Sequence, residues 1–180
     1  ATSAESGRAA ACGGEDQAEE GHAVQSRTRP ARGRVGSRAM PAALPDWPAG
    51  TVCVLATTGD DGPHAIPVST AQRAGDARIV LALARTRGSL ARLRRDPRVA
   101  LTVVAGPDLA FTAHGRASVA ADPLPGVEAV VAVAIAVDAV ARHERPTFAI
   151  DAGVTWRWTD AEALERDDAV RLGLAALPHA

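Results

Sequence analysis

The chain has 180 residues, which is long enough for one domain of ordinary size with a substantial core, together with tails. Its formal net charge is -1, with 20 basic residues, all arginine, and 21 acidic residues, and this balance argues against a dedicated nucleic-acid-binding protein. Cys12 and Cys53 lie far apart in unlike surroundings, which excludes a disulfide framework or a cysteine metal motif and fits a reducing cytoplasm.

Residues 1–40 are rich in Ala, Gly, Ser, Glu and Arg and contain almost no large apolar side chain. Such a segment cannot bury enough surface to offset its ordering entropy, so we predict a disordered tail. The tail carries several arginines without aromatic partners for base stacking, so we prefer a solvated tail to a nucleic-acid-binding one: Arg27, Arg29, Arg32, Arg34 and Arg38. Met40 is the only methionine and precedes the first apolar segment, so we expect the natural protein to begin there.

Membrane insertion is not expected. The N-terminus lacks the apolar region of a signal peptide. The most hydrophobic stretch, 127–137, is interrupted by Glu128 and is too short to cross a bilayer. We therefore expect a cytoplasmic protein.

The first predicted strands form a hairpin. Residues 51–58 (TVCVLATT) are apolar on both faces, which is typical of a strand buried on both sides, and Cys53 is interpreted as a core residue there. Residues 59–63 (GDDGP) have turn chemistry, and 64–70 (HAIPVST) return as the partner strand. Pro67 cannot donate to a sheet, so it marks an edge, a bulge, or a place where a ligand replaces the neighbouring strand.

The most informative stretch is 77–104. It predicts a strand at 79–83, a short helix capped by Ser89 and ended by Asp96-Pro97, and a second strand at 99–104. Backbone N–H groups, hydroxyls and guanidinium groups converge at the start of this helix, which favours a phosphate site made by Arg85, Thr86, Arg87, Ser89 and Arg92. The alternative is a solvated, charged helix face.

The remaining chain adds further strands. Residues 109–120 read as a long strand with a bulge at Gly115. In 130–137, β-branched residues alternate with alanine, which indicates a strand rather than a helix, with a register shift near Asp138. Short strands are expected at 147–150 and 154–158, and Thr159 has the spacing of a cap for a helix ending near residue 177. About eight strands joined by short turns predict a mainly β fold, an antiparallel barrel that is closed or nearly closed, with short helices.

Several of these segments together resemble the pyridoxamine 5'-phosphate oxidase-like family of FMN-binding split β-barrels. They are 55–70 (LATTGDDGPHAIPVST), 83–103 (LARTRGSLARLRRDPRVALTV), 110–119 (AFTAHGRASV) and 147–158 (TFAIDAGVTWRW). The second segment, with its LRRDPRVAL ending, is the most specific. Together with the tail and the C-terminal helix predicted above, this resemblance gives three regions: a disordered tail (1–40), a flavin-binding split barrel (41–159) and a C-terminal helix (160–180).

The resemblance also implies a homodimer with two flavins at the subunit interface. The flavin ring is expected along the backbone of Ile66, Pro67, Val68 and Ser69, and the phosphate against Arg85, Thr86, Arg87, Ser89 and Arg92. Two roles stay open for Trp156 and Trp158: they close the pocket, or they pack on the barrel. Many relatives have a lysine in the phosphate turn, whereas this chain has none, so the charge has to come from Arg87 and Arg92.

The implied function is that of a flavin-dependent oxidoreductase that transfers hydride or electrons between FMN and a small organic substrate. No catalytic triad or metal motif is evident, so the catalytic residues are unknown and no metal is expected. Two alternatives remain: a deazaflavin-dependent reductase, and a flavin- or haem-binding sensor without turnover.

Overall fold

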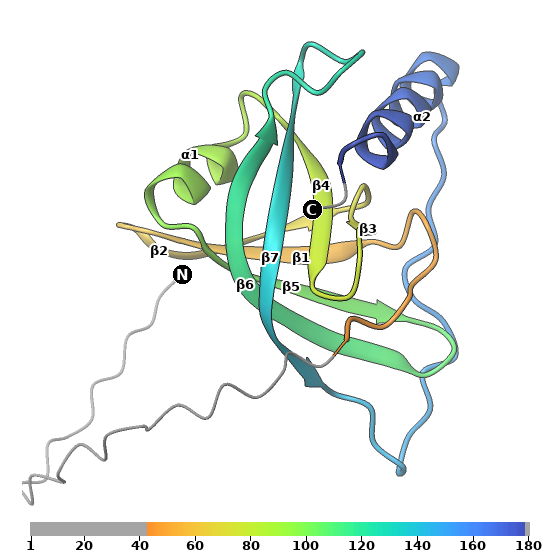
Figure 1. The fold of residues 1–180 in the computed structure, drawn as a ribbon. Helices are drawn as coiled ribbons and strands as arrows, with labels where there is room; N and C mark the ends of the chain where they lie inside the picture. The colour runs from red at the N-terminus through yellow and green to blue at the C-terminus, as the bar shows by residue number, and fades with distance from the viewer. Residues whose placement is uncertain (1–42, 179–180) are drawn as a thin grey trace, which may run out of the picture. The chain divides into compact units, whose positions relative to one another are not determined.

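The computed structural model describes residues 43–178 (Figure 1). The predicted disordered tail, with its arginines, Cys12 and Met40, lies outside the described residues. In the described part, the chain forms seven strands and two helices. Helix α1 (Gly88–Arg95) lies between the fourth and fifth strands, and α2 (Ala161–Ala175) follows the last strand.

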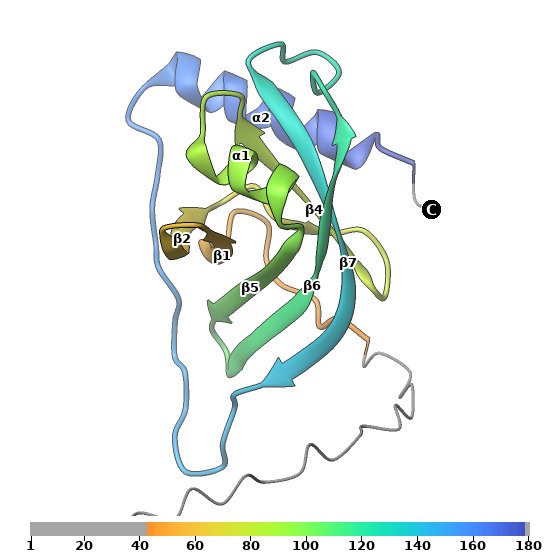
Figure 2. The ribbon, with the colours of Figure 1, turned by 90° about the vertical axis from the view of Figure 1, so that its left-hand side faces the viewer.

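Seven strands form one antiparallel sheet in the order β2-β1-β5-β6-β7-β4-β3. The strands are β1 (Cys53–Gly59), β2 (Gly62–Val68), β3 (Gln72–Arg73), β4 (Arg78–Ala84), β5 (Arg98–Ala105), β6 (Leu109–Ala121) and β7 (Val130–Arg142). The prediction of a mainly β, antiparallel split barrel is therefore confirmed. Full closure is not found, because β2 and β3 remain as the two edges of the sheet. Figure 2 shows one of these edges, β2, next to β1 and away from β6 and β7.

The strands predicted at 147–150 and 154–158 are wrong. These residues run without strand pairing between β7 and α2, and they are attached at single points. The Ile150 N–H donates to the Asp108 carboxylate at 2.7 Å, and the Trp156 indole N–H donates to the Gly50 carbonyl at 2.8 Å. Their sequence has strand composition, but a strand also needs a sheet edge to pair with, and composition does not reveal one.

The alternation in β7 divides its side chains between two cores. The branched side chains of Val131, Val133 and Ile135 face the interior of the curled sheet, where they are buried with residues of β1, β4, β5, β6 and α1. Ala132 and Ala134 face the other way and are buried beneath Val170, Leu174 and Leu177, on and just after α2. The strand prediction is confirmed, and the small alanines explain how α2 can approach the sheet closely.

The register of β6 and β7 shifts where the sequence predicted it. His114 pairs with Ala139 and Gly115 pairs with Val137, so Asp138 is an extra residue on β7. A Cβ atom at Gly115 would lie 2.1 Å from the Ala136 carbonyl oxygen, a distance that no side chain tolerates. Glycine is required here because the two backbones approach closely at the bulge.

Both predicted helix N-caps are wrong, by two residues at α1 and by one residue at α2. Arg87, rather than Ser89, precedes α1 as the N-cap, no side chain caps this helix, and Ser89 is buried in its first turn. At α2 the cap is Asp160 rather than Thr159, and its carboxylate accepts from the Ala163 N–H at 2.7 Å. At α2 the neighbours Thr159 and Asp160 both suit the cap position, so the pattern alone does not select one, whereas α1 begins before Ser89 and has no side-chain cap.

Within residues 43–178, neither helix has the length and apolar character needed to span a membrane.

We predict that Gly115→Ala destabilises the fold by about 1–3 kcal/mol or more, because the new methyl group must displace the β7 backbone. Gly88→Ala is the matched control, since a Cβ atom there meets nothing within 4 Å and alanine favours the helix. Urea denaturation should give a lower midpoint for Gly115→Ala and an unchanged or higher midpoint for Gly88→Ala. Equal midpoints for the two variants would contradict the close approach at the bulge.

Candidate functional site

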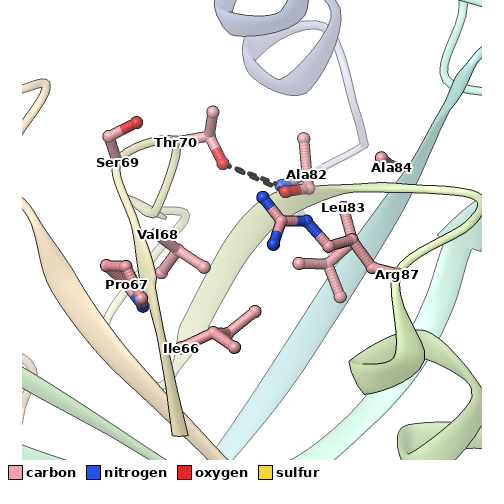
Figure 3. Close-up of a pocket in the computed structure, with 9 residues that line it drawn as sticks. All are labelled: Ile66, Pro67, Val68, Ser69, Thr70, Ala82, Leu83, Ala84 and Arg87. Carbon is pink, nitrogen blue, oxygen red and sulfur yellow. Dashed lines mark hydrogen bonds between the residues drawn. The ribbon is translucent and has the colours of Figure 1, made fainter.

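A cleft separates the two edges of the sheet. β3 pairs with β4 only at Val80 and Ile79, so the end of β4, from Ala82 to Ala84, has no strand on that side. The other edge strand, β2, faces this end of β4 across a cavity of about 170 Å³ (Figure 3). Unpaired strand edges expose backbone N–H and C=O groups, so this cavity can hydrogen-bond a polar ring edge.

Thr70, which follows β2 in the chain, connects the two edges by hydrogen bonds to Ala82 of β4. Its hydroxyl donates to the Ala82 carbonyl at 3.3 Å and accepts from the Ala82 N–H at 3.1 Å. One side chain thus satisfies both backbone groups that a neighbouring strand would otherwise pair (Figure 3). The cleft begins where this contact ends.

The cleft is lined mainly by backbone and apolar side chains. Its lining residues are Ile66, Pro67, Val68, Ser69, Thr70, Ala82, Leu83, Ala84 and Arg87. Four of them are the residues 66–69 that the sequence analysis assigned to a flavin ring. Pro67 lies on an edge strand, which is one of the three alternatives that its sequence position left open.

Arg87 is the charged residue of the lining. As the N-cap residue of α1 it has extended backbone angles (φ −70°, ψ 127°), and its side chain extends from the helix start into the cleft (Figure 3). None of the ion pairs found among residues 43–178 includes Arg87, although all the other arginines of the 85–98 stretch are paired. The cleft therefore has an uncompensated positive charge at one end.

Four aspartates pair with the five other arginines near α1, so one of those five positive charges is not neutralised. Arg85 and Arg94 both pair with Asp122, the latter at 2.8 Å. Arg95 pairs with Asp60 at 3.1 Å, and Arg98 pairs with Asp96 at 2.6 Å. Each pair reduces the positive charge near α1 without contributing to the cleft.

Arg92 forms a two-pronged contact with Asp61 in the β1–β2 turn. The Arg92 hydrogen bond holds the pKa of the Asp61 carboxyl at about 2, well below its ordinary value. This contact ties the hairpin that carries β2 to the helix that carries Arg87.

The other residues predicted to bind cofactor do not line the cleft. Arg85 and Arg92 are paired as described, Thr86 is exposed in the turn, and Ser89 is buried within α1. Trp156 donates to Gly50 and packs edge-on against Trp158, with 5.1 Å between ring centroids. The aspartate partners lie 28 to 37 residues from Arg85, Arg92 and Arg94 in the sequence, so local sequence reasoning could not find them.

The sequence analysis missed four lining residues: Thr70, Ala82, Leu83 and Ala84. Thr70 had a detectable signal, because a threonine directly after an edge strand is suited to replace a missing strand partner. The alanines and Leu83 carry no such signal, since they look like ordinary core residues of β4.

Other reactive side chains lie elsewhere. Cys53 is fully buried, as predicted for a core residue, and burial raises the pKa of its thiol to about 12. His143 shares a hydrogen bond with the Thr112 hydroxyl at 2.8 Å, and neither residue lines the cleft. In the part of the chain that the structure describes, no group of three or more His, Cys, Asp or Glu residues is placed to hold a metal ion.

Comparison with known proteins gives one family match. The sequence model described as pyridoxamine 5'-phosphate oxidase matches residues 40–153, a segment that includes the whole sheet, α1 and the cleft. No curated protein sequence matches the chain.

Solved structures show a more distant likeness. General Stress Protein 26 from Bacillus anthracis is 20% identical, with 51% of this chain and 82% of that chain covered and a TM-score of 0.43. An FAD-binding protein from Mesorhizobium loti is 17% identical, with 51% and 84% covered and a TM-score of 0.43. An F420 reductase is 14% identical, with 52% and 91% covered and a TM-score of 0.47. These likenesses are too distant to indicate a shared activity.

We predict that stability falls as the pH drops from about 4 to about 2, partly because Asp61 and Asp96 lose their arginine contacts. Arg92 and Arg98, respectively, lower the pKa of each carboxyl to about 2 from an ordinary value of 3.8. A group with a lowered folded-state pKa stabilises the fold above its unfolded-state pKa and loses that contribution as it is protonated. The urea midpoint of an Asp61→Asn/Asp96→Asn double variant should therefore fall less steeply over this pH range than that of the unmodified protein.

Asp168→Asn serves as the control, because Asp168 is exposed and takes part in no ion pair found within 43–178. Its pH profile should follow that of the unmodified protein. Parallel profiles for all three proteins would show that the arginine contacts of Asp61 and Asp96 do not contribute to stability.

Proposed function

The chain belongs to the pyridoxamine 5'-phosphate oxidase family, whose model matches residues 40–153, and from this premise we propose that it binds a flavin in the cleft between β2 and β4. The observation that carries the proposal is the pairing pattern of the arginines. Arg87 is the lining residue whose charge is not compensated by a carboxylate among the described residues, and it lies where two unpaired strand edges meet α1.

The residues of the cleft fit the chemistry of a flavin. A flavin needs backbone groups for the polar edge of its ring, apolar contacts for the ring faces, and a cation for its phosphate. The edges of β2 and β4 offer the backbone groups. Ile66, Val68 and Leu83 offer the apolar contacts, and Arg87 is the cation.

We assign the phosphate to Arg87 and the first turn of α1. This turn contains no acidic side chain, and no side chain caps it. The Leu90 N–H donates to the Arg87 carbonyl at 3.0 Å, whereas the N–H groups of Gly88 and Ser89 make no hydrogen bond found within residues 43–178 and remain available to an anion. The guanidinium of Arg87 adds a planar pair of donors suited to phosphate oxygens. The same arrangement favours FMN over a flavin without phosphate.

The size of the cleft supports a site that a second subunit completes. Its volume of about 170 Å³ is below the ~300 Å³ at which pockets for whole small ligands begin. A flavin bound here would extend beyond one chain, and we propose that a second copy of this chain covers the rest in a homodimer. Trp156 and Trp158, both partly exposed, are available for such a contact.

The proposed activity is that of an oxidoreductase acting in the cytoplasm on a small organic substrate. When bound, the flavin supplies the hydride- or electron-transferring chemistry. The residues of the chain hold it. The backbone of residues 66–69, at the end of β2 and just after it, orients the ring. Leu83 and Val68 keep water from the ring face, and Arg87 retains the phosphate.

Haem is less suited to this cleft than a flavin. Haem iron needs an axial ligand such as His, Cys, Met or Tyr, and none of these residue types lines the cavity. A deazaflavin meets the same requirements as FMN, so titration with both cofactors side by side, followed by reduction with NAD(P)H, separates an FMN oxidoreductase from a deazaflavin-dependent reductase and from a sensor that does not turn over.

We predict that Arg87→Ala weakens FMN binding by about 1.5–3 kcal/mol, or roughly 10- to 150-fold in Kd, because a hydrogen-bonded charge partner of the phosphate is lost. Riboflavin, which has the same ring and no phosphate, should bind both proteins equally. Arg95→Ala is the control, since Arg95 lies on the same helix but pairs with Asp60 at 3.1 Å. Flavin fluorescence titration measures the Kd of FMN and of riboflavin for the unmodified protein and for each of the two variants.

Each outcome has a defined meaning. A loss confined to FMN and to Arg87→Ala supports the phosphate assignment. An equal loss for riboflavin would mean that Arg87 contacts the ring, and unchanged FMN affinity would remove Arg87 from the site.

A further inference from the structure

Arg171 of the C-terminal helix contacts the backbone of a residue that lines the cleft. Its Nη2 group donates to the Ser69 carbonyl oxygen at 3.1 Å, and its Nε group donates to the Asp167 carboxylate at 2.7 Å. The Arg171 side chain is 19% exposed and the Asp167 side chain 9% exposed, so water screens this contact little. The guanidinium therefore forms a charge-assisted hydrogen bond with the backbone of a residue that lines the cleft.

This contact fixes the Ser69–Thr70 peptide group. The C=O and N–H groups of a trans peptide lie in one plane and point in opposite directions. Since the Ser69 carbonyl points toward Arg171 on α2, the Thr70 N–H points away from that helix. Ser69 and Thr70 both line the cleft, and none of the hydrogen bonds found within residues 43–178 uses the Thr70 N–H.

A charged donor on the carbonyl oxygen also changes the N–H group of the same peptide. It withdraws electron density from the peptide, and hydrogen bonds polarise one another along such a chain, so the N–H becomes a stronger donor. The second terminal nitrogen of Arg171, Nη1, is buried without an acceptor in the described part of the chain, which leaves Ser69 as the acceptor on the sheet side.

We infer that Arg171 is a positioning residue for the cofactor: through the Ser69 carbonyl it orients and polarises the peptide whose Thr70 N–H donates to the flavin ring. The inference rests on the proposed function and adds a residue to it. α2 lies beyond the family match, which ends at residue 153, so this link between helix and cleft belongs to the chain's own C-terminal segment.

The consequence is a tuned reduction potential. A reduced flavin carries more negative charge on its ring than an oxidised one, and a strong, fixed N–H donor stabilises that charge. Arg171 therefore raises the potential of the bound flavin and strengthens its binding.

The experiment compares three variants with the unmodified protein. Asp167→Asn/Arg171→Gln removes the donor without leaving Asp167 as a buried, unpaired charge. Arg171→Lys keeps the charge, but a single ammonium group does not reproduce the fork that spans Asp167 and Ser69. Arg166→Gln is the matched control, because Arg166 lies on the exposed side of the same helix and pairs only with Glu162 at 2.8 Å.

The measurements are the FMN Kd, the midpoint potential of bound FMN, and the Thr70 amide proton shift in the flavin-free protein. For the double variant we expect a Kd raised roughly 3- to 10-fold, the range for one N–H hydrogen bond, a more negative potential, and an upfield Thr70 amide proton. Arg171→Lys should fall between the double variant and the unmodified protein, and Arg166→Gln should match the unmodified protein.

A folded double variant with unchanged Kd and potential would overturn the inference. If the double variant does not fold, Arg171→Lys decides by the same measurements, and an unshifted Thr70 amide proton in it overturns the inference. If the unmodified protein binds no flavin, the proposed function fails, and the inference about the cofactor fails with it. The Thr70 shift in the flavin-free protein still reports separately whether Arg171 polarises the peptide.

Discussion

Two strand edges that face each other without pairing are the constraint on which this structure depends. Exposed edges normally attract further strands, and proteins usually cover or shorten them. Here β3 ends after two residues, and the Thr70 hydroxyl takes over one further position by bonding both backbone groups of Ala82. Beyond that point β2 and β4 diverge, and the backbone groups between them remain available to a ligand. Arg87, at the start of α1, lines this opening, and Arg171 of α2 contacts it indirectly through the Ser69 carbonyl.

The positive charge of the site is what remains after most of the nearby arginines have paired with aspartates. The segment from Arg85 to Arg98 looks strongly basic in the sequence, yet Asp60, Asp61, Asp96 and Asp122 pair with nearly all of its arginines. These exposed pairs contribute little stability individually, but they determine where positive charge is left. What remains is one charge on Arg87, at the end of the cleft, and one shared by Arg85 and Arg94, which both pair with Asp122.

The fold was largely predictable because its signals are local. The alternation in β7 predicted a strand, and Gly115 predicted the bulge that the register shift at Asp138 confirms. The site was predictable only in part. Residues 66–69 and Arg87 line the cleft, whereas the pairing of Arg92 with Asp61 and the contact of Arg171 with Ser69 join residues 31 and 102 positions apart. Contacts of this kind depend on the curvature of the sheet, and no local pattern reports them.

Backbone hydrogen exchange with and without FMN tests the central claim, that the ligand occupies the opening between β2 and β4, most directly. The account predicts that FMN slows exchange in two segments, 66–70 and the first turn of α1, and leaves exchange unchanged in the loop 144–150, which borders a separate cavity. Binding of FMN with protection confined to that loop, or to any surface away from the opening, would contradict it.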